Sequence, residues 1–568
     1  MADIFQSITL KRPQSSLFNL SYSNKLTGNF GYLYPFYYEE TIPGDTFRIS
    51  SDVIVRMPAL LAPLMHDVDI CLNFFQVPYR LLWNNWDSFI TGGPDGKSAP
   101  ALPCFRLNGP TGLGAFQTGS LADYLGVSSP GSATGIDFSV SAMPFLAYYM
   151  IWRDYFRDAN LDTDVIGEDG RPLIEVDGNL FNLDNWRQLT SFHKISWTKD
   201  YFTSALPFAQ RGDSVEIPLD FESTDLTVKR RKASSPQYDQ WVHLNGASID
   251  PIAFGSDLGQ ALTLGDMSPG ASPYSATHMG LKKDVSQTGT GPYYNAFSPQ
   301  TAIGYNPNGS LYAELPEYAS ADINDLRQAA ALQRWLETSA RGGSRYIEQI
   351  YAHFGVKSSD ARLQRPQYLG GYRVPIQISD VMQTSQSTSD SVLGDYAGRG
   401  VAAGSTHSVS ARCEEYGCVI GVAAVRPKTG YMQGIRRHFM KLDKYDFYFP
   451  EFAHLGEQAI YNAEIYAPSV YGKEGSGGLD TFGYTPRYAE YKSHPNEVHG
   501  EFKTTLDYWH LTRKFSSLPK LNAEFVRCSP NYNIFPVTGE NEAHFYMEFY
   551  NRVRARRLMP YHGIPTLM

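Results

Sequence analysis

The sequence predicts a mainly β protein with many turns. Aromatic residues make up 14% of the 568 residues and include 38 Tyr, and the chain also carries 49 Gly and 35 Pro. Aromatic side chains fit the pleated surface of a sheet, whereas Gly and Pro supply the backbone angles that turns need. Hydrophobic residues at 42% against charged residues at 19% indicate enough apolar surface to drive folding.

Alternation of apolar and polar side chains locates most of the strands. In residues 67–74, for example, Val68, Ile70 and Leu72 share one face, which is the pattern of a strand with one buried side. Residues 418–425 are instead continuously apolar, which predicts a strand covered on both faces. We therefore expect strands at residues 47–56, 67–74, 372–378, 418–425, 501–511 and 543–553.

Two helices are expected against this β background. Residues 143–158 carry a broad apolar face, with charged residues on the remainder. A second helix follows Asp322, which can act as its N-cap. The pair Gly342 and Gly343 is expected to interrupt this helix before a further helical segment at residues 347–354.

The connections at residues 207–320 and 426–498 are far longer than usual. We expect contacts between copies of the chain, and not the core of one copy, to order them, with the aromatic stretch 445–452 at the centre of such a contact. Residues 245–310 hold ten Gly, six Pro and eight Ser, which predicts an irregular insertion. A flexible linker between domains is the alternative for this segment.

Signals of a membrane, secreted or metal-binding protein are weak. The longest uncharged apolar run, residues 142–152, is far shorter than the roughly 20 residues that cross a bilayer, and the first residues lack a signal-peptide core. Five scattered cysteines favour a reducing compartment. His494, Glu497 and His499 are close in sequence but lack the spacing of a metal-binding helix, which favours a surface loop. We predict no metal and no cofactor.

Catalytic motifs are also missing from the sequence. It contains no phosphate-binding loop with its lysine, no GxSxG nucleophile elbow and no HExxH helix. Two of the many Asp and Glu residues could form a glycosidase pair, but nothing in the sequence selects which two. We expect a protein without catalytic residues. A carbohydrate-active jelly-roll enzyme is the alternative, and a cupin-like metal enzyme is a third, disfavoured class.

The C-terminal strand offers the best candidate for contact with nucleic acid. A net charge of -9 argues against a wholly basic surface, so such a contact has to be local. Alternate positions of this strand place three arginines on one face at about 6.6 Å spacing, and Arg gives planar, multi-donor contacts to phosphate. The alternatives are a solvated tail or pairing with carboxylates of a neighbouring subunit. The candidate residues are Arg552, Arg554, Arg556 and Arg557.

Longer strings carry more information than composition. They are LLWNNWDSF from Leu81, ALQRWLETSARGGSRYIEQIYAHFGV from Ala331, DARLQRPQYLGG from Asp360, RRHFMKLDKYDFYFPEFAHLGEQ from Arg436, FGYTPRYAEYKSHPNEVHGEF from Phe482 and FYMEFYNRVRARRLMPYHGIPTLM at the end. From about Phe30 to Met568 the chain resembles the major capsid protein of microviruses, which are small single-stranded DNA phages, and specifically of the gokushovirus-like branch. The similarity weakens across residues 245–310, where that family is itself variable.

The resemblance implies a single domain over residues 1–568, an eight-stranded antiparallel jelly roll of the viral capsid type with very long interstrand loops. It further implies self-assembly, through pentamers, into a T=1 icosahedral shell around a circular single-stranded DNA genome. In this family, an insertion corresponding to residues 245–310 forms protrusions at the threefold axes that are thought to meet a host surface receptor.

The other implied partners are a small basic DNA-condensing protein and, as further candidates, scaffolding and pilot proteins. The implied location is the virion, assembled in the cytoplasm of a bacterial host.

Overall fold

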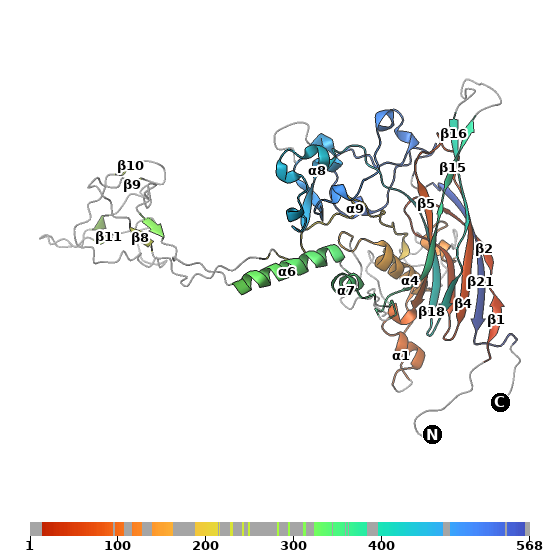
Figure 1. The fold of residues 1–568 in the computed structure, drawn as a ribbon. Coiled ribbons are helices and arrows are strands. Elements are labelled where there is room, and N and C mark those ends of the chain that lie inside the picture. Colours follow the sequence, from red (N-terminus) through yellow and green to blue (C-terminus); the bar gives the residue numbers. More distant parts are fainter. Residues whose placement is uncertain are drawn as a thin grey trace. The chain divides into compact units, whose positions relative to one another are not determined.

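The computed structural model describes the chain in two compact units (Figure 1). Unit 1 comprises residues 1–214 and 333–568, and unit 2 comprises residues 215–332. The described residues are 14–94, 97–106, 116–127, 139–162, 188–213, 215, six short strands between 228 and 313, 323–343, 345–357, 359–361, 363–382, 396–469, 478–539 and 542–562. Most of the predicted insertion 245–310 lies outside them.

Two antiparallel sheets form the centre of unit 1. The first has seven strands: β1 (Ser16–Asn19), β2 (Tyr22–Gly28), β4 (Thr46–Arg56), β15 (Gln377–Met382), β16 (Tyr396–Ser405), β17 (Val409–Arg412) and β21 (Phe545–Arg557). The second has four strands: β3 (Tyr34–Thr41), β5 (Val68–Pro78), β14 (Gln367–Pro375) and β18 (Gly417–Pro427).

The strand order is that of a jelly roll. The strands β2 to β5 alternate between the sheets, and so do β14, β16, β18 and β21. As a result β2, β21, β4 and β16 are neighbours in one sheet, and β3, β18, β5 and β14 in the other. The predicted mainly β, capsid-type fold class is therefore confirmed. The larger sheet carries more strands than the four that each sheet of an eight-stranded jelly roll needs, because β1, β15 and β17 add to it.

The sheets enclose one apolar core, and the four-stranded sheet has a second core behind it. Side chains such as Phe47, Leu72 and Phe549 fill the space between the sheets. On the other face of the four-stranded sheet, Phe75 packs with residues of α4 (Met143–Ile151) such as Phe145. Figure 1 shows these layers in order: β21 and β4, then β5 and β18, then α4. The outer face of the seven-stranded sheet stays exposed.

Most of the remaining helical elements of unit 1 are short. The α-helices are α1 (Trp86–Thr91), α3 (Leu121–Tyr124), α6 (Ile323–Gly342, which begins in unit 2), α7 (Tyr346–Phe354), α8 (Asn462–Ile465) and α9 (Ala523–Val526). The segment η2 (Trp152–Phe156) continues α4 as a π-helix. The 3₁₀ turns are η1 (Tyr79–Leu81), η3 (Arg437–Met440), η4 (Lys444–Asp446), η5 (Pro450–Phe452), η6 (Ala467–Ser469), η7 (Ala489–Tyr491), η8 (Gly500–Lys503) and η9 (Asp507–Trp509).

Short strand pairs complete the structure. In unit 1 they are β6 (Cys104–Arg106) with β7 (Ser139–Ser141) and β19 (Glu457–Tyr461) with β20 (Thr481–Pro486). In unit 2 they are β8 (Val228–Arg230) with β13 (Leu311–Ala313), β9 (Trp241–Val242) with β10 (Ser248–Ile249), and β11 (Leu281–Lys282) with β12 (Tyr294–Asn295).

The structure corrects two strand predictions. Residues 501–511 are not a strand: Gly500 has a positive φ of 67°, and the Glu501 carbonyl accepts turn hydrogen bonds from the amides of Thr504 and Leu506, both at 3.0 Å. Residues 372–378 are not one strand either, because they run from β14 in one sheet into β15 in the other. The strands predicted at 47–56, 67–74, 418–425 and 543–553 are present.

The long connection 426–498 has a core of its own, which corrects the expectation that only contacts between copies would order it. Tyr431, Ile460 and Phe482 are buried together with residues from 201–205 and 525–526. Most of the other long connection, residues 207–320, lies outside the described residues.

The predicted helices are present. Residues 143–156 are helical, although α4 is buried nearly all round and does not present a broad charged side. The helix α6 ends at Gly342, and α7 follows it at Tyr346, as the glycine pair indicated. The predicted N-cap, Asp322, lies outside the described residues.

Candidate nucleic-acid interface

The strand β21 has one buried face and one exposed face along its whole length. Its odd-numbered residues are buried up to Ala555, and its even-numbered residues are exposed. Pairing explains this regularity: β4 lies along one edge of β21, and β2 and then β1 lie along the other. The extended conformation therefore persists past Tyr550 to Arg557.

Three of the four predicted arginines form a row on the exposed face. Arg552, Arg554 and Arg556 lie opposite Ser50, Arg48 and Thr46 of β4, respectively. The guanidinium of Arg552 pairs with the carboxylate of Asp52 on β4. Across from Arg554, Arg48 donates from Nε to the Ser408 hydroxyl at 3.0 Å. These side chains point to solvent, so the row can reach a ligand without any change in the backbone.

The whole exposed sheet face is basic. The outward positions of β2, β4, β16, β17 and β21 hold eight basic residues against two acidic ones. The basic residues of this sheet face are Lys25, Arg48, Arg56, Arg399, Arg412, Arg552, Arg554 and Arg556. Both acidic residues are already paired: Asp52 binds Arg552, and Glu548 binds Lys25 at 3.2 Å. The hydrogen bond from Lys25 is the largest cause of the lowered pKa of Glu548.

Two tyrosines lie in line with the arginine row. Tyr546 and Tyr550 are 50% and 45% exposed, respectively, on the same face of β21. The guanidinium carbon of Arg552 lies 5.9 Å from the ring centroid of Tyr550, within the range of a cation–π contact. Exposed aromatic rings between cationic side chains are the combination that binds single-stranded nucleic acid by stacking and by charge.

Arg557 lies apart from this row. Its Nη2 donates to Glu39 Oε1 at 2.6 Å and to the Glu40 carbonyl at 3.1 Å, and its side chain is only 15% exposed. Its Nε is 3.7 Å from the carboxylate of Asp45, which is fully buried and whose pKa is raised by that burial. Arg557 therefore joins the end of β21 to β3 and its turn.

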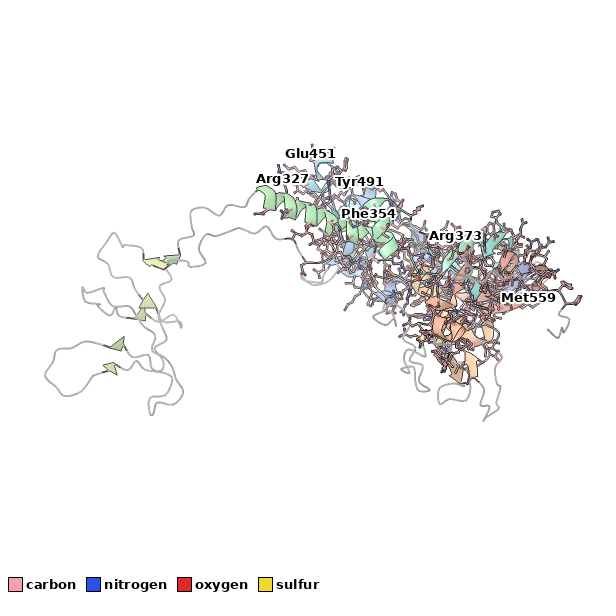
Figure 2. The ribbon with its side chains drawn as sticks, turned by 90° about the horizontal axis from the view of Figure 1, so that it is seen from below. Arg327, Phe354, Arg373, Glu451, Tyr491 and Met559 are labelled. Carbon is pink, nitrogen blue, oxygen red and sulfur yellow. The ribbon has the colours of Figure 1, made fainter. Side chains whose placement is uncertain are left out.

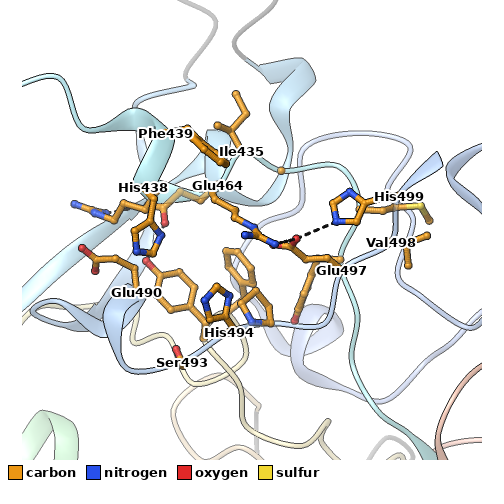
Figure 3. A pocket seen from close by; sticks show the side chains of 18 of the residues that line it. Ile435, His438, Phe439, Glu464, Glu490, Ser493, His494, Glu497, Val498 and His499 are labelled. Atoms are coloured by element: carbon orange, nitrogen blue, oxygen red, sulfur yellow. Dashed lines mark hydrogen bonds and ion pairs between the residues drawn. The ribbon is translucent and has the colours of Figure 1, made fainter.

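A separate cavity of about 310 Å³ lies beside residues 434–439 (Figure 3). Each of its three carboxylates is held by a cation. Glu464 accepts from Arg437 at 2.9 Å, Glu490 lies 2.8 Å from Lys441, and Glu497 pairs with Arg436 and lies 3.3 Å from His499. This pairing leaves no free carboxylate pair for acid–base work in this cavity.

The comparisons with known proteins agree with one another. A model of the family described as capsid protein (F protein) matches residues 5–567. The chain belongs to the capsid protein (F protein) family. It is similar to capsid protein VP1 of Chlamydia phage 1 (33% identity, covering 100% of this chain and 98% of the relative) and to VP1 of Bdellovibrio phage phiMH2K (34%, 99% and 97%). VP1 of Spiroplasma virus 4 is 28% identical over 95% of this chain and 93% of the relative.

These matches confirm the resemblance to gokushovirus-like microvirus capsid proteins. This capsid protein is thus a structural component of a virion, and its relatives are structural proteins and not carbohydrate-active or cupin-like enzymes. Within the described residues, no group of three or more His, Cys, Asp and Glu is placed to hold a metal ion. None of the described helices has the length and apolar character to span a bilayer.

Sequence reasoning missed most of the basic sheet face. The predicted strand at residues 47–56 contains Arg48 and Arg56, but the sequence did not show that this strand lies next to β21. Lys25, Arg399 and Arg412 come from three further strands. Alternation showed which way each side chain points, whereas the pairing of distant strands was needed to gather them on one surface.

Proposed function

We propose that this capsid protein assembles, through pentamers, into a closed T=1 icosahedral shell that encloses a circular single-stranded DNA genome. The observation that carries the DNA part is the uncovered basic sheet face in a chain with a net charge of -9. An acidic chain gains nothing in solubility from gathering eight basic residues on one exposed face, whereas a polyanion bound there would balance them. This face is therefore proposed to look inward.

The arginine row is the proposed centre of the DNA contact. Successive even-numbered residues of a strand lie about 6.6 Å apart, so Arg552, Arg554 and Arg556 can meet successive phosphates. Tyr546 and Tyr550 would stack with bases. Arg557 was part of the sequence prediction, but its contacts with Glu39 and the Glu40 carbonyl suit it better to holding the strand in place.

Changing Arg552, Arg554 and Arg556 together to Ala tests this proposal. The slope of log affinity against log salt for single-stranded DNA should fall by about 2, at roughly 0.7 per phosphate contact. The matched control replaces the same three residues by Lys, which keeps the charge and should keep the slope. An unchanged slope in the Ala variant, together with weakened shell assembly, would assign these arginines to a protein interface instead.

A second surface supports self-association. Residues 442–451 are all exposed, and large apolar side chains crowd this segment and its flanks. We define the aromatic surface as Phe439, Leu442, Tyr445, Phe447, Tyr448, Phe449 and Leu455. At about 100 Å² for each of these seven side chains, it offers about 700 Å², close to the roughly 800 Å² that each partner of a stable complex buries. The proposed occupant is a second copy of the chain.

The remaining parts of the proposal rest on the family resemblance. Residues 245–310 would form the protrusion that contributes to host attachment through a surface receptor, and their Gly, Pro and Ser content suits an exposed irregular segment. A small basic DNA-condensing protein would balance further phosphate charge inside the shell. Assembly would take place in the bacterial cytoplasm, with scaffolding and pilot proteins as further candidate partners.

A further inference from the structure

A second basic site lies on the other side of the four-stranded sheet. It is a pocket of about 540 Å³ between η2, residues 196–206, the end of α6, the start of α7, and the strands β14 and β18. Two carboxylates, Asp158 and Glu348, belong to its wall, as do the aromatic side chains of Tyr155, Phe156 and Trp197. Six basic side chains line it: Arg157, Lys199, Arg341, Arg345, Arg373 and Arg426.

Three of these cations are balanced by carboxylates. Lys199 pairs with Asp158, and Arg345 lies 3.1 Å from Glu348. Arg341 donates from Nε to Glu457 Oε1 at 3.0 Å. These three pairs fix the walls of the pocket and use up both of its carboxylates.

Arg373 and Arg426 face the pocket with less compensation. Arg426 donates only weakly to the Ser196 carbonyl, at 3.4 Å. Neither Arg373 nor Arg426 has a carboxylate oxygen within 4.0 Å among the residues that the structure describes. Arg157 donates to the Asp162 carbonyl at 2.9 Å. Asp69, the register partner of Arg426, faces the same side of the sheet but forms no ion pair with either arginine, and the lining of the pocket holds six basic side chains against two carboxylates.

Strand register places Arg373 and Arg426 on the same face of the four-stranded sheet. Arg373 on β14 lies opposite Cys71 of β5, and Arg426 on β18 lies opposite Asp69 of the same strand. Paired residues of adjacent strands point to the same face, so both arginines stand on the side of the sheet that faces away from the central core. With one strand between them, their backbones are roughly 10 Å apart, a gap that two arginine side chains can close around one anion. Figure 2 labels Arg373 on this sheet.

We propose that this pocket binds a phosphate monoester of nucleotide size, a nucleoside or sugar phosphate, with Arg373 and Arg426 on the phosphate. A phosphate monoester carries close to two negative charges at pH 7, which suits two arginines that form no ion pair, whereas each internal phosphate of DNA carries only one. The guanidinium group of arginine can donate two parallel hydrogen bonds to two oxygens of one phosphate. The volume suits a ligand of this size, and the aromatic wall supplies apolar surface for its organic part.

This site is independent of the proposed DNA interface. The arginine row belongs to the seven-stranded sheet and faces away from the central core, while the pocket lies beyond the four-stranded sheet on the opposite side. A failure of one proposal therefore leaves the other intact.

Isothermal titration of the full chain with deoxyadenosine monophosphate tests the proposal. We expect saturable binding, and at least about tenfold weaker binding when both Arg373→Gln and Arg426→Gln are introduced. Arg373→Lys alone keeps the positive charge but loses the planar guanidinium with its paired donors, so it should weaken binding less than the double variant does. The matched control is Arg334→Gln, an exposed arginine of α6 outside the pocket, which should bind like the unchanged chain. Thermal unfolding of each variant checks that it is folded.

Three further probes separate the sources of the phosphate. Glucose 6-phosphate should bind through the same arginines, and inorganic phosphate should compete with both monoesters. A single-stranded oligonucleotide without a terminal phosphate should bind without any dependence on Arg373 and Arg426. The proposal is overturned if the unchanged chain binds no monoester at millimolar concentration, if the double variant binds it equally well, or if only the oligonucleotide depends on these two arginines.

Discussion

Arg557 shows how the role of a residue depends on the side of the strand where it lies. Its neighbours Arg554 and Arg556 point to solvent, but Arg557 contacts Glu39 and lies near the fully buried Asp45. Arg557→Ala would leave both carboxylates without their cation and should destabilise the fold by about 2 kcal/mol, less than a fully buried pair because Glu39 is partly exposed. Urea unfolding measures this change.

The matched control for that prediction is Arg554→Ala. Arg554 is an exposed residue of the same strand, so its removal should change the free energy of unfolding by less than about 0.5 kcal/mol. Equal losses in the two variants would mean that Arg557 stabilises the fold through strand propensity alone, and not through its ion pairs.

We expect His193 to make the stability of the fold depend on pH. Its ring stacks on Trp152, with centroids 4.1 Å apart, and burial lowers its pKa to about 4. The unfolded chain, with a pKa of about 6.5 for this residue, binds a proton more readily, so folding stability is complete above pH 6.5 and falls as the pH drops toward 4. This shift corresponds to about 3 kcal/mol. His193→Gln should flatten the dependence of unfolding free energy on pH in that window, whereas an unchanged slope would assign the acid sensitivity to other groups.

At the scale of single elements, the periodicity of apolar residues predicted which face of a strand is buried better than it predicted where the strand ends. The apolar run 418–425 became β18, whose two faces contribute to two different cores. The alternation of residues 372–378 continued across a strand break: the amide of Ile376 bonds to the Val68 carbonyl at 2.8 Å, and the chain then enters the other sheet. Alternation carries no information about such a crossing, because both strands bury the same side against one shared core.

The candidate interface was predictable in part from the same alternation of buried and exposed residues. Arg552, Arg554 and Arg556 lie on one strand, so the period of two was enough to group them. The facing of Arg557 also follows from this period, but its partners Glu39 and Asp45 lie some 500 residues earlier in the chain. Only the register between β21 and β4 brings Arg48 and Arg56 to the same surface.

At the scale of the whole of unit 1, the basic sheet face and the aromatic surface are well separated. Figure 2 places Glu451 and Tyr491, beside the aromatic surface, far from Met559, which follows β21. Figure 1 agrees, because α8 lies to the left of the sheets, whereas β21 belongs to the seven-stranded sheet at the right. The two proposed contacts, one with DNA and one with neighbouring subunits, therefore do not compete for the same surface of a subunit.

The aromatic surface should control assembly without controlling folding. Phe439, Leu442 and Phe447 are exposed in the single chain, up to 93% for Leu442, so changing all three to Ser removes little packing within one copy. The three side chains offer about 300 Å², so at about 25 cal/mol per Å² their loss should weaken each contact between copies by about 7 kcal/mol, a rise in dissociation constant on the order of 10⁵-fold. Sedimentation and electron microscopy should then show folded subunits where the unchanged chain forms shells. Met65→Ser is the matched control, since Met65 is also an exposed apolar residue but lies outside this surface.

In shells of the unchanged chain, amide exchange at residues 442–451 should be slower than in dissociated subunits. Shells formed by the triple variant at the usual concentration, with equal exchange in both states, would place the contact between copies elsewhere.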